Sequence, residues 1–285
     1  MRSKRIAILL IAAATLATVG CTEKEKADTV KASRVYNSNH VKAEMFNPVT
    51  ETWTTLTENT TERKPKVEFY WNGDRLDSIY AGGSIFYTTC DSKGRITKAH
   101  TPLSYQIYDI EYGSDGQMSR SIYSITDDNG DTIMRETANY TWSDGKLQRI
   151  MFNHWSKEPT TSGLIKEEYQ YTWKGDNVTK SVRYAFYDDG DIDTTTYDYE
   201  VANVLNPFAG FAFFQIPYCG YTGSFHGTDG LNKNMVSHIK GANSTHDYEY
   251  TTSGDRVTSF TGKTFSESST TRMTIEDTYE FEYVN

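Results

Sequence analysis

The sequence lacks the patterns by which most enzymes and nucleic-acid-binding proteins are recognised. No G-x-S-x-G motif of a serine hydrolase is present, and no two histidines have the HExxH spacing that binds zinc. There is also no run of basic residues, and the net charge is −9. An acidic chain of this kind is a poor ligand for nucleic acid. We therefore predict no cofactor and no nucleic-acid partner, and expect scattered, non-ligating histidines at His40, His100, His154, His226, His238 and His246.

Cysteine is also scarce, at three residues in 285. Cys21 ends an N-terminal leader and is considered with it below. Cys90 and Cys219 could form a disulfide in an oxidising compartment, or both could stay unpaired as small apolar side chains. The sequence leaves these two alternatives open.

The first 21 residues have the pattern of an export signal. Three basic residues near the start precede an apolar stretch, small residues and Cys21. The ending TVGC resembles a lipobox, although Thr18 stands where leucine is commonest. We expect a signal peptide over 1–20 and a lipid on Cys21; the alternative is an ordinary signal peptide. Removing three positive charges from −9 leaves −12 on the processed chain.

The residues after the leader set the expected address of the protein. Segment 22–33 is charged and poor in apolar residues, so we expect a flexible lipidated tether over 21–45. Glu23 and Glu25 partly resemble the surface-export signal of some Gram-negative lipoproteins. The expected location is the outer membrane, on its periplasmic side or at the cell surface, with the membrane as partner through the lipid on Cys21.

A short phrase recurs along the rest of the chain. Each copy has an aromatic-rich approach, a polar turn with glycine, an apolar residue after the turn, and an apolar or small residue three places later. Recurrence every twenty to thirty residues is typical of a repeat architecture. The first apolar residues after the turns, called post-turn residues below, are Leu76, Ile96, Met118, Leu147, Val178 and Val257.

Each copy is predicted to be a β-hairpin. Tyr169, Tyr171 and Trp173 alternate with polar residues, as in a strand with one dry face. A two-residue turn at Asp144-Gly145 would place Trp142 opposite Leu147, and the same count places Trp173 opposite Val178. Hairpins joined by further turns predict an all-β, antiparallel up-and-down meander, either a curved sheet or a barrel, as one domain over 46–285.

One feature conflicts with simple alternation. The apolar residue three places after a post-turn residue, such as Ile79 after Leu76 or Ile150 after Leu147, should fall on the opposite face. Either a β-bulge after each turn restores the phase, or the sheet is apolar on both faces near its turns.

The hairpins, the segment NPFAGFAFFQIPYCGY at 206–221 and LNKNMVSHI at 231–239 resemble an uncharacterised family of gut-bacterial lipoproteins with a porin-like fold. YTTCDSKGRITKA at 87–99 also resembles the YD repeats of secreted shell proteins. The family resemblance implies a curved or closed β-meander on a lipid anchor and no activity. We expect 206–233 to be an irregular apolar plug or lid, since 207–221 is too short to span a bilayer.

Two groups of residues have the chemistry of a binding site. The acidic residues of DGDIDTTTYDYE imitate a calcium loop, but Thr194 stands where that loop needs glycine, so an acidic turn is expected instead. Three tryptophans recur at one place in the repeat and could stack sugar rings, although a core role is expected. The weak calcium candidates are Asp189, Asp191, Asp193 and Glu200, and the tryptophans are Trp71, Trp142 and Trp173.

Three functional hypotheses follow. The first is a lipid-anchored, non-catalytic envelope protein that acts as a binding or structural module, with an unknown glycan or protein partner. The second is a glycan- or peptide-acting hydrolase whose site is assembled from several hairpins. The third, a membrane-spanning pore, requires an apolar outer band, which strands with Glu, Lys and Arg opposite their aromatic face would not provide.

Overall fold

The computed structural model describes residues 32–47, 52–72, 75–81, 84–102, 105–157, 163–209 and 230–283. The predicted signal peptide at 1–20 and the predicted lipidation site Cys21 lie outside these ranges. The described residues form sixteen β-strands. They are β1 Ala32–Asn47, β2 Thr52–Asn72, β3 Arg75–Ala81, β4 Ser84–Cys90, β5 Ile96–His100, β6 Gln106–Tyr112, β7 Met118–Thr126, β8 Thr132–Ser143, β9 Lys146–Ser156, β10 Leu164–Lys174, β11 Asn177–Tyr187, β12 Ile192–Leu205, β13 Asn234–Lys240, β14 Ser244–Ser253, β15 Arg256–Glu267 and β16 Thr271–Tyr283.

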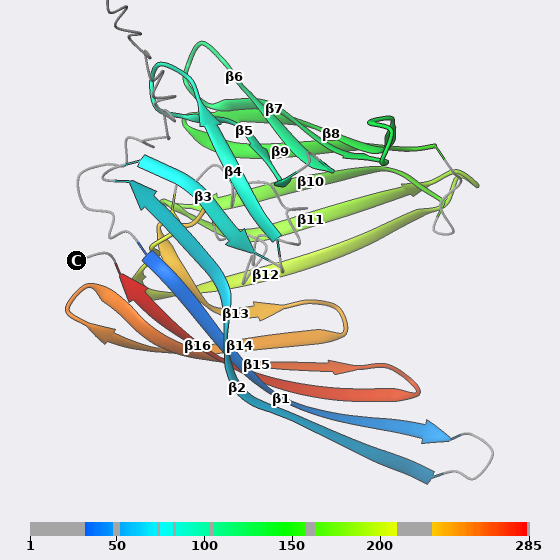
Figure 1. Cartoon of the computed structure of the whole chain (residues 1–285). Coiled ribbons are helices and arrows are strands. Elements are labelled where there is room, and N and C mark those ends of the chain that lie inside the picture. Colours follow the sequence, from blue (N-terminus) through cyan, green and yellow to red (C-terminus); the bar gives the residue numbers. More distant parts are fainter. Residues whose placement is uncertain are drawn as a thin grey trace, which may run out of the picture.

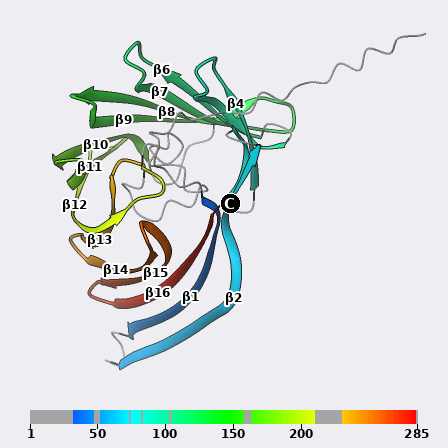
Figure 2. The same ribbon diagram turned by 90° about the vertical axis from the view of Figure 1, so that its left-hand side faces the viewer.

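Every strand pairs antiparallel with the next one along the chain, as the predicted meander requires (Figure 1). The order also returns to its start, because β1 pairs with β16 as well as with β2. The strands therefore follow one another around a barrel, seen from another side in Figure 2. The six repeat turns all lie at one end of this barrel, called the repeat end, and the turns between repeats lie at the opposite end.

The repeat turns have the backbone predicted for them. Asp144 and Gly145 both have positive φ, at 53° and 71°, which matches the right-handed twist of the flanking strands. Trp142 lies opposite Leu147, and Trp173 lies opposite Val178. Both cross-strand pairs predicted from the sequence are confirmed.

A β-bulge resolves the conflict over alternation. In each repeat the strand after the turn carries one extra residue, directly after the post-turn residue, so Trp142 faces Leu147 while Thr141 faces Arg149. Leu147 and Ile150 therefore point to the same face, and both are fully buried. The six extra residues are Asp77, Thr97, Ser119, Gln148, Thr179 and Thr258.

A bulge disrupts the ladder and leaves carbonyl groups in need of donors. One set is satisfied by the bulged residue itself: the Thr258 hydroxyl donates to the carbonyl of Thr251 at 3.1 Å. A second set of carbonyls, those of the post-turn residues, accepts hydrogen bonds from the next repeat. The donor there is the ring N–H of a tryptophan. Trp142 Nε1 donates to Met118 O at 2.7 Å, and Trp173 Nε1 donates to Leu147 O at 2.7 Å. These ring donors thus join consecutive repeats along this part of the barrel.

Inward-pointing aromatic rings pack against one another in the core of the barrel. Tyr108 stacks on Tyr123 with ring centroids 4.5 Å apart and meets the edge of Phe86 at 5.9 Å. Across the barrel Phe260 stacks on Tyr279 at 4.4 Å. Large rings stabilise a wide barrel because each buries a large apolar area at a small entropy cost.

The structure bears on the predicted bounds of the tether and of the plug. Strand β1 begins at Ala32, so the tether expected over 21–45 was drawn too long; its later residues form a strand because both β2 and β16 supply hydrogen-bond partners. Most of the predicted plug at 206–233 lies outside the described residues. At its start Phe208 is buried, with ring centroids 6.1 Å from Phe69 and 6.0 Å from Phe281.

Candidate functional site

Four charged side chains converge on the inner face of the barrel. Glu136, His154, Glu167 and Arg183 come from β8, β9, β10 and β11, one from each of four neighbouring strands. Each occupies a position that strand alternation directs inward. We call these four residues the charge ladder, since acidic and basic groups alternate across the strands.

The contacts within the charge ladder are direct. His154 Nδ1 lies 3.2 Å from Glu136 Oε1, and His154 Nε2 lies 3.0 Å from Glu167 Oε2. The second oxygen of Glu167 accepts a hydrogen bond from Arg183 Nε. Glu167 has no exposed surface, so partners such as His154 and Arg183 supply the stabilisation that water would otherwise give its carboxylate.

The environment of His154 controls its protonation. Burial by itself would lower the pKa of His154, but the hydrogen bonds and negative charges of Glu136 and Glu167 outweigh burial and raise the pKa to about 9. The imidazole is therefore protonated at neutral pH, and both ring nitrogens donate hydrogen bonds.

This arrangement is better suited to holding strands together than to catalysis. A protonated His154 cannot accept a proton as a general base at neutral pH, and Glu167 has no surface on which a substrate could make contact. The hydrolase hypothesis predicted convergent acidic groups and histidine, and the charge ladder meets that description. Within the charge ladder, however, protonation of His154 and burial of Glu167 leave neither of these two residues available as a general base at neutral pH.

Tyrosine hydroxyls form a second polar layer in the interior. Tyr140 bonds to Ser121 at 2.8 Å, and Tyr199 bonds to Ser181 at 2.8 Å. Tyr171 is buried between them in the sheet, and its hydroxyl has no hydrogen-bond partner among the described residues. Burial raises the pKa of Tyr171 well above its ordinary value, with a smaller contribution from nearby tyrosines. The Tyr171 phenol therefore stays neutral at physiological pH.

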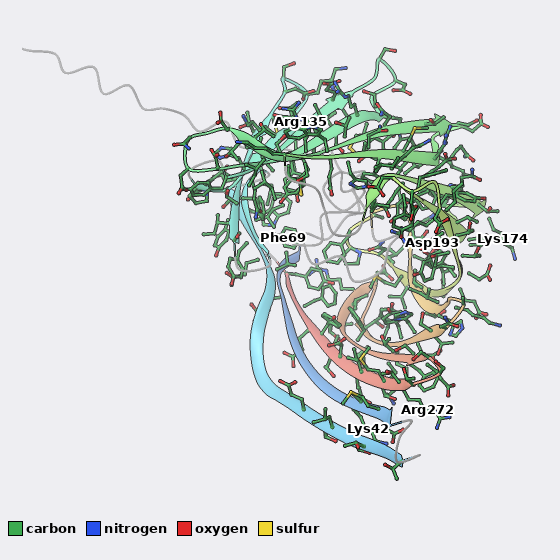
Figure 3. All side chains as sticks on the ribbon, turned by 90° about the vertical axis from the view of Figure 1, so that its right-hand side faces the viewer. Lys42, Phe69, Arg135, Lys174, Asp193 and Arg272 are labelled. Carbon is green, nitrogen blue, oxygen red and sulfur yellow. The ribbon has the colours of Figure 1, made fainter. Side chains whose placement is uncertain are left out.

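The outer face of the same wall is polar. Glu168 points outward and accepts hydrogen bonds from Arg149 at 2.6 Å and from Gln170 at 2.9 Å. Burial would raise the pKa of Glu168, but these bonds and the charge of Arg149 hold it below its ordinary value. On the far wall Lys263 pairs with Glu276 at 3.7 Å. Side chains project from both faces of the wall around the whole barrel (Figure 3).

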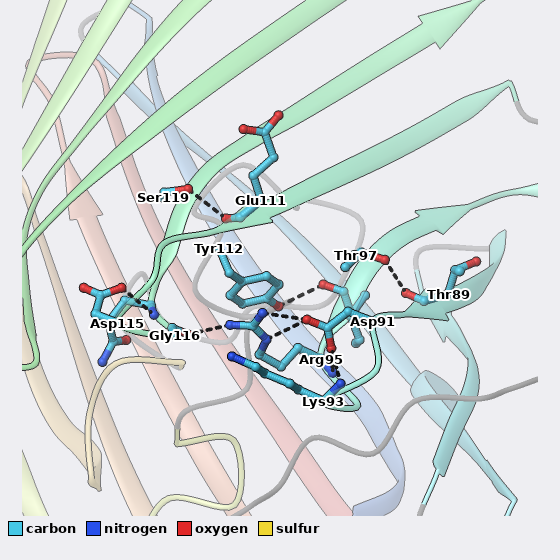
Figure 4. A network of polar contacts seen from close by, with 12 residues as sticks. Thr89, Asp91, Lys93, Arg95, Thr97, Glu111, Tyr112, Asp115, Gly116 and Ser119 are labelled. Carbon is cyan, nitrogen blue, oxygen red and sulfur yellow. Dashed lines mark hydrogen bonds and ion pairs between the residues drawn. The ribbon is translucent and has the colours of Figure 1, made fainter.

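At the repeat end Arg95 forms an ion pair within its own turn and a hydrogen bond to the next turn (Figure 4). Asp91 accepts hydrogen bonds from Arg95 Nη2 at 2.6 Å and from Arg95 Nε at 2.9 Å. Arg95 also donates to Gly116 O at 3.3 Å and lies 4.1 Å above the ring of Tyr112. Burial opposes ionisation of Asp91, but Arg95 and two backbone amides hold the pKa of Asp91 below its ordinary value.

The candidate tryptophans lie at the repeat end. Trp71, Trp142 and Trp173 are partly buried and pack against the core, and the hydrogen bonds of Trp142 and Trp173 to backbone carbonyls give those two a structural role. Stacking of sugars on them stays a prediction.

The acidic residues of the calcium candidate are divided between a turn and the strand that follows it. Asp189 and Asp191 belong to the turn before β12, where the Asp189 carboxylate accepts a hydrogen bond from the backbone of Asp191 at 3.0 Å. Asp193 and Glu200 lie seven positions apart on the extended strand β12, about 23 Å at the usual rise. Within the described part of the chain, no group of three potential metal ligands is present.

The other histidines have separate surroundings. His238 Nδ1 contacts Asp247 at 2.7 Å, and His246 Nδ1 contacts Thr264 at 2.8 Å. His100 Nδ1 lies 3.0 Å from Thr101 O. His226 and the side chain of His40 lie outside the described residues.

Cys90 takes part in a disulfide bond. Its partner, and Cys219 with it, lie outside the described residues, so the pairing of Cys90 with Cys219 stays a prediction. The chain has only one other cysteine, Cys21.

Comparison with known proteins supports the fold. No family model matches the chain, and no curated protein matches its sequence. Among solved structures it is similar to a porin-like protein from Bacteroides uniformis ATCC 8492, with 13% identity and a TM-score of 0.51, over 90% of this chain and 98% of that one. A porin-like protein from Bacteroides vulgatus ATCC 8482 is 10% identical with a TM-score of 0.44, over 90% and 99% of the two chains. The first likeness confirms a porin-like β fold.

No helix among the described residues is long and apolar enough to cross a membrane.

Proposed function

We propose that this chain is a lipid-anchored, non-catalytic protein of the bacterial outer membrane whose barrel acts as a binding or structural module. The observation that carries the proposal is a barrel with an aromatic interior and a charged outer wall. The N-terminal leader ending in Cys21 and the structural likeness to a porin-like Bacteroides protein support the address.

The outer wall argues against insertion of the barrel in the bilayer. A lipid-facing barrel needs an uninterrupted apolar outer band. Here the outward positions include Arg149 and Glu168 on one wall and Lys263 and Glu276 on the other. Placing such groups in hydrocarbon is costly, so we infer that the lipid on Cys21, rather than the barrel, contacts the bilayer.

The position of the start of β1 indicates which end of the barrel the proposed lipid anchor is joined to. Ala32 pairs with Tyr283 at the repeat end of the barrel. The ten residues between Cys21 and Ala32 span at most about 35 Å when fully extended. The lipid would thus keep the repeat end, with its tryptophans, nearest the membrane.

Replacement of Cys21 tests the anchor. Lipid attachment forms a thioether, so the full chain with Cys21→Ser should be exported without incorporating a fatty-acid analogue and should leave the membrane fraction. Wild type should carry the label and sediment with membranes, because several acyl chains give stable anchoring. Cys219→Ser serves as a matched control and should still be labelled. Equal labelling of Cys21→Ser and wild type would refute the anchor.

The binding half of the proposal needs a separate experiment. Glycan arrays and calorimetry with purified lipidated protein should find an envelope or dietary polymer that binds. Trp71→Ala would weaken this binding if the tryptophan row stacks on sugars, whereas the exposed Trp155→Ala would leave it unchanged. If no polymer binds, the binding half of the proposal is refuted and only a structural role for the barrel remains.

A further inference from the structure

Strand β2 is paired on both sides over only part of its length. It pairs with β1 from Thr52 to Glu68, but β3 pairs only with Val67–Asn72. Among the residues that the structure describes, segment 54–60 therefore has β1 on one side and no strand on the other. Figures 2 and 3 show this half of β2 as the outer border of its wall. The barrel wall is thus interrupted toward the opposite end.

This border has the chemistry of a strand that accepts a partner. Its free side presents unpaired backbone N–H and C=O groups, which proteins usually protect with lysine, proline or a bulge. The sequence of 54–60 is TTLTENT, with Glu58 as its one charged residue and without lysine or proline. The threonines favour extended strands, so the segment is ready to pair.

An apolar strip runs beside the same edge. Leu56 is 57% exposed and pairs with Ala43 of β1, which in turn pairs with Met273 of β16. Met45, two positions along β1, is 45% exposed. A strand added to β2 would extend the sheet and cover part of this exposed apolar surface.

We propose that segment 54–60 pairs with the same segment of a second copy of this chain, forming an antiparallel dimer across one continuous sheet. A two-fold axis perpendicular to the sheet keeps each side chain on its own face. The axis must therefore lie midway between two copies of the same residue, one on each strand. Centred on Leu56, the pairing places Leu56 against its copy, Thr55 against Thr57 and Thr54 against Glu58. No like charges face each other, and threonine pairs are favourable cross-strand neighbours.

The self-complementary edge favours a second copy over a charged peptide partner. Glu58 is the one charge that the segment offers, and in this register it faces a threonine hydroxyl instead of another carboxylate. The register therefore brings no two carboxylates of the segment directly opposite each other.

Cysteine cross-linking of the full chain in the cell envelope tests the register. Leu56→Cys should give a disulfide-linked dimer on a non-reducing gel, because the two thiols face each other. Glu58→Cys lies on the same exposed strand, but its copies would be about 13 Å apart, beyond disulfide reach. A dimer band from Leu56→Cys alone supports the proposal; no band, or equal bands from both, overturns it.

Light scattering of the purified, lipidated full chain in detergent tests whether the free edge of β2 is needed for the dimer. Wild type should show twice the monomer mass, whereas Leu56→Lys should show the monomer mass because two like charges would face each other. Ile192→Lys, at a position 56% exposed on β12, is the matched control and should remain dimeric. Circular dichroism should match wild type for both variants, since both positions are exposed. A monomeric wild type, or a dimeric Leu56→Lys, contradicts the proposal.

Discussion

His154, on β9, donates from Nε2 to the carboxylate of Glu167 on β10 at 3.0 Å, on the inner face of the barrel. Glu167 has no exposed surface, so loss of this donor leaves a buried charge with one fewer partner. Substitutions that leave a buried charge without its partner are among the most destabilising in proteins.

His154→Asn should lower the free energy of unfolding by about 3 kcal/mol at neutral pH, because a neutral amide replaces the charged partner. Urea denaturation followed by tryptophan fluorescence measures this loss. His238→Asn is the control: His238 contacts Asp247 on the outer face, where loss of an ion pair costs less than about 1 kcal/mol.

The same histidine predicts a pH dependence. The folded pKa of about 9 lies above the ordinary value of 6.5, so His154 contributes its full stabilisation below about pH 6.5. This stabilisation is lost as the pH rises through 9. The free energy of unfolding of wild type should therefore fall between pH 6.5 and 9 by more than that of His154→Asn. Parallel pH profiles for the two proteins would contradict the assigned protonation.

Trp173→Phe should cost about 1–3 kcal/mol, because it keeps a ring but removes the donor to the carbonyl of Leu147. Thermal or urea unfolding measures the change. Trp155→Phe makes the same chemical change at a position 52% exposed and should stay within about 0.5 kcal/mol of wild type. Equal stability of the two variants would show that the bond between repeats contributes nothing.

Deletion of Gln148 should prevent folding. Without the bulged residue, the rest of β9 shifts by one position, and Ile150, Phe152 and His154 turn to the outer face. Gln148→Ala keeps the bulge and should change stability by less than about 1 kcal/mol. Circular dichroism distinguishes the outcomes, and a folded deletion variant would mean that the strand reaches its phase by another route.

The disulfide of Cys90 makes a separate prediction. Proteolysis under non-reducing conditions should release a peptide that joins Cys90 to Cys219, identifiable by mass spectrometry and lost on reduction. Cys21 should instead carry the lipid. A peptide joining Cys90 to Cys21 would contradict both the predicted pairing and the anchor.

Much of the local structure followed from the sequence. The pairing of Trp142 with Leu147 could be counted from one Asp-Gly turn, because hairpin contacts are close along the chain and the turn type sets the register. The six-fold repetition also showed that a bulge or a second apolar face was needed at Ile79 and Ile150. The bulge itself required coordinates, since one extra residue leaves no trace in composition.

The charge ladder could be predicted only in part. Glu167 falls on the same face as Tyr169 and Tyr171, so strand alternation alone marks it as an acidic residue on a dry face. That signal was missed, and it would not have identified the partners. Glu136, His154 and Arg183 lie on other strands, and alternation gives the face of a residue but not its neighbour across the sheet.

The sequence alone thus determined the hairpins and the inward faces, because both depend on residues a few positions apart. The tertiary structure decided which side chains meet, and that β1 closes the ring by pairing with β16 at the far end of the chain. It also left 54–60 of β2 without a second neighbour. These relationships depend on how hairpins are placed against one another, and that placement is set by contacts between segments far apart in sequence.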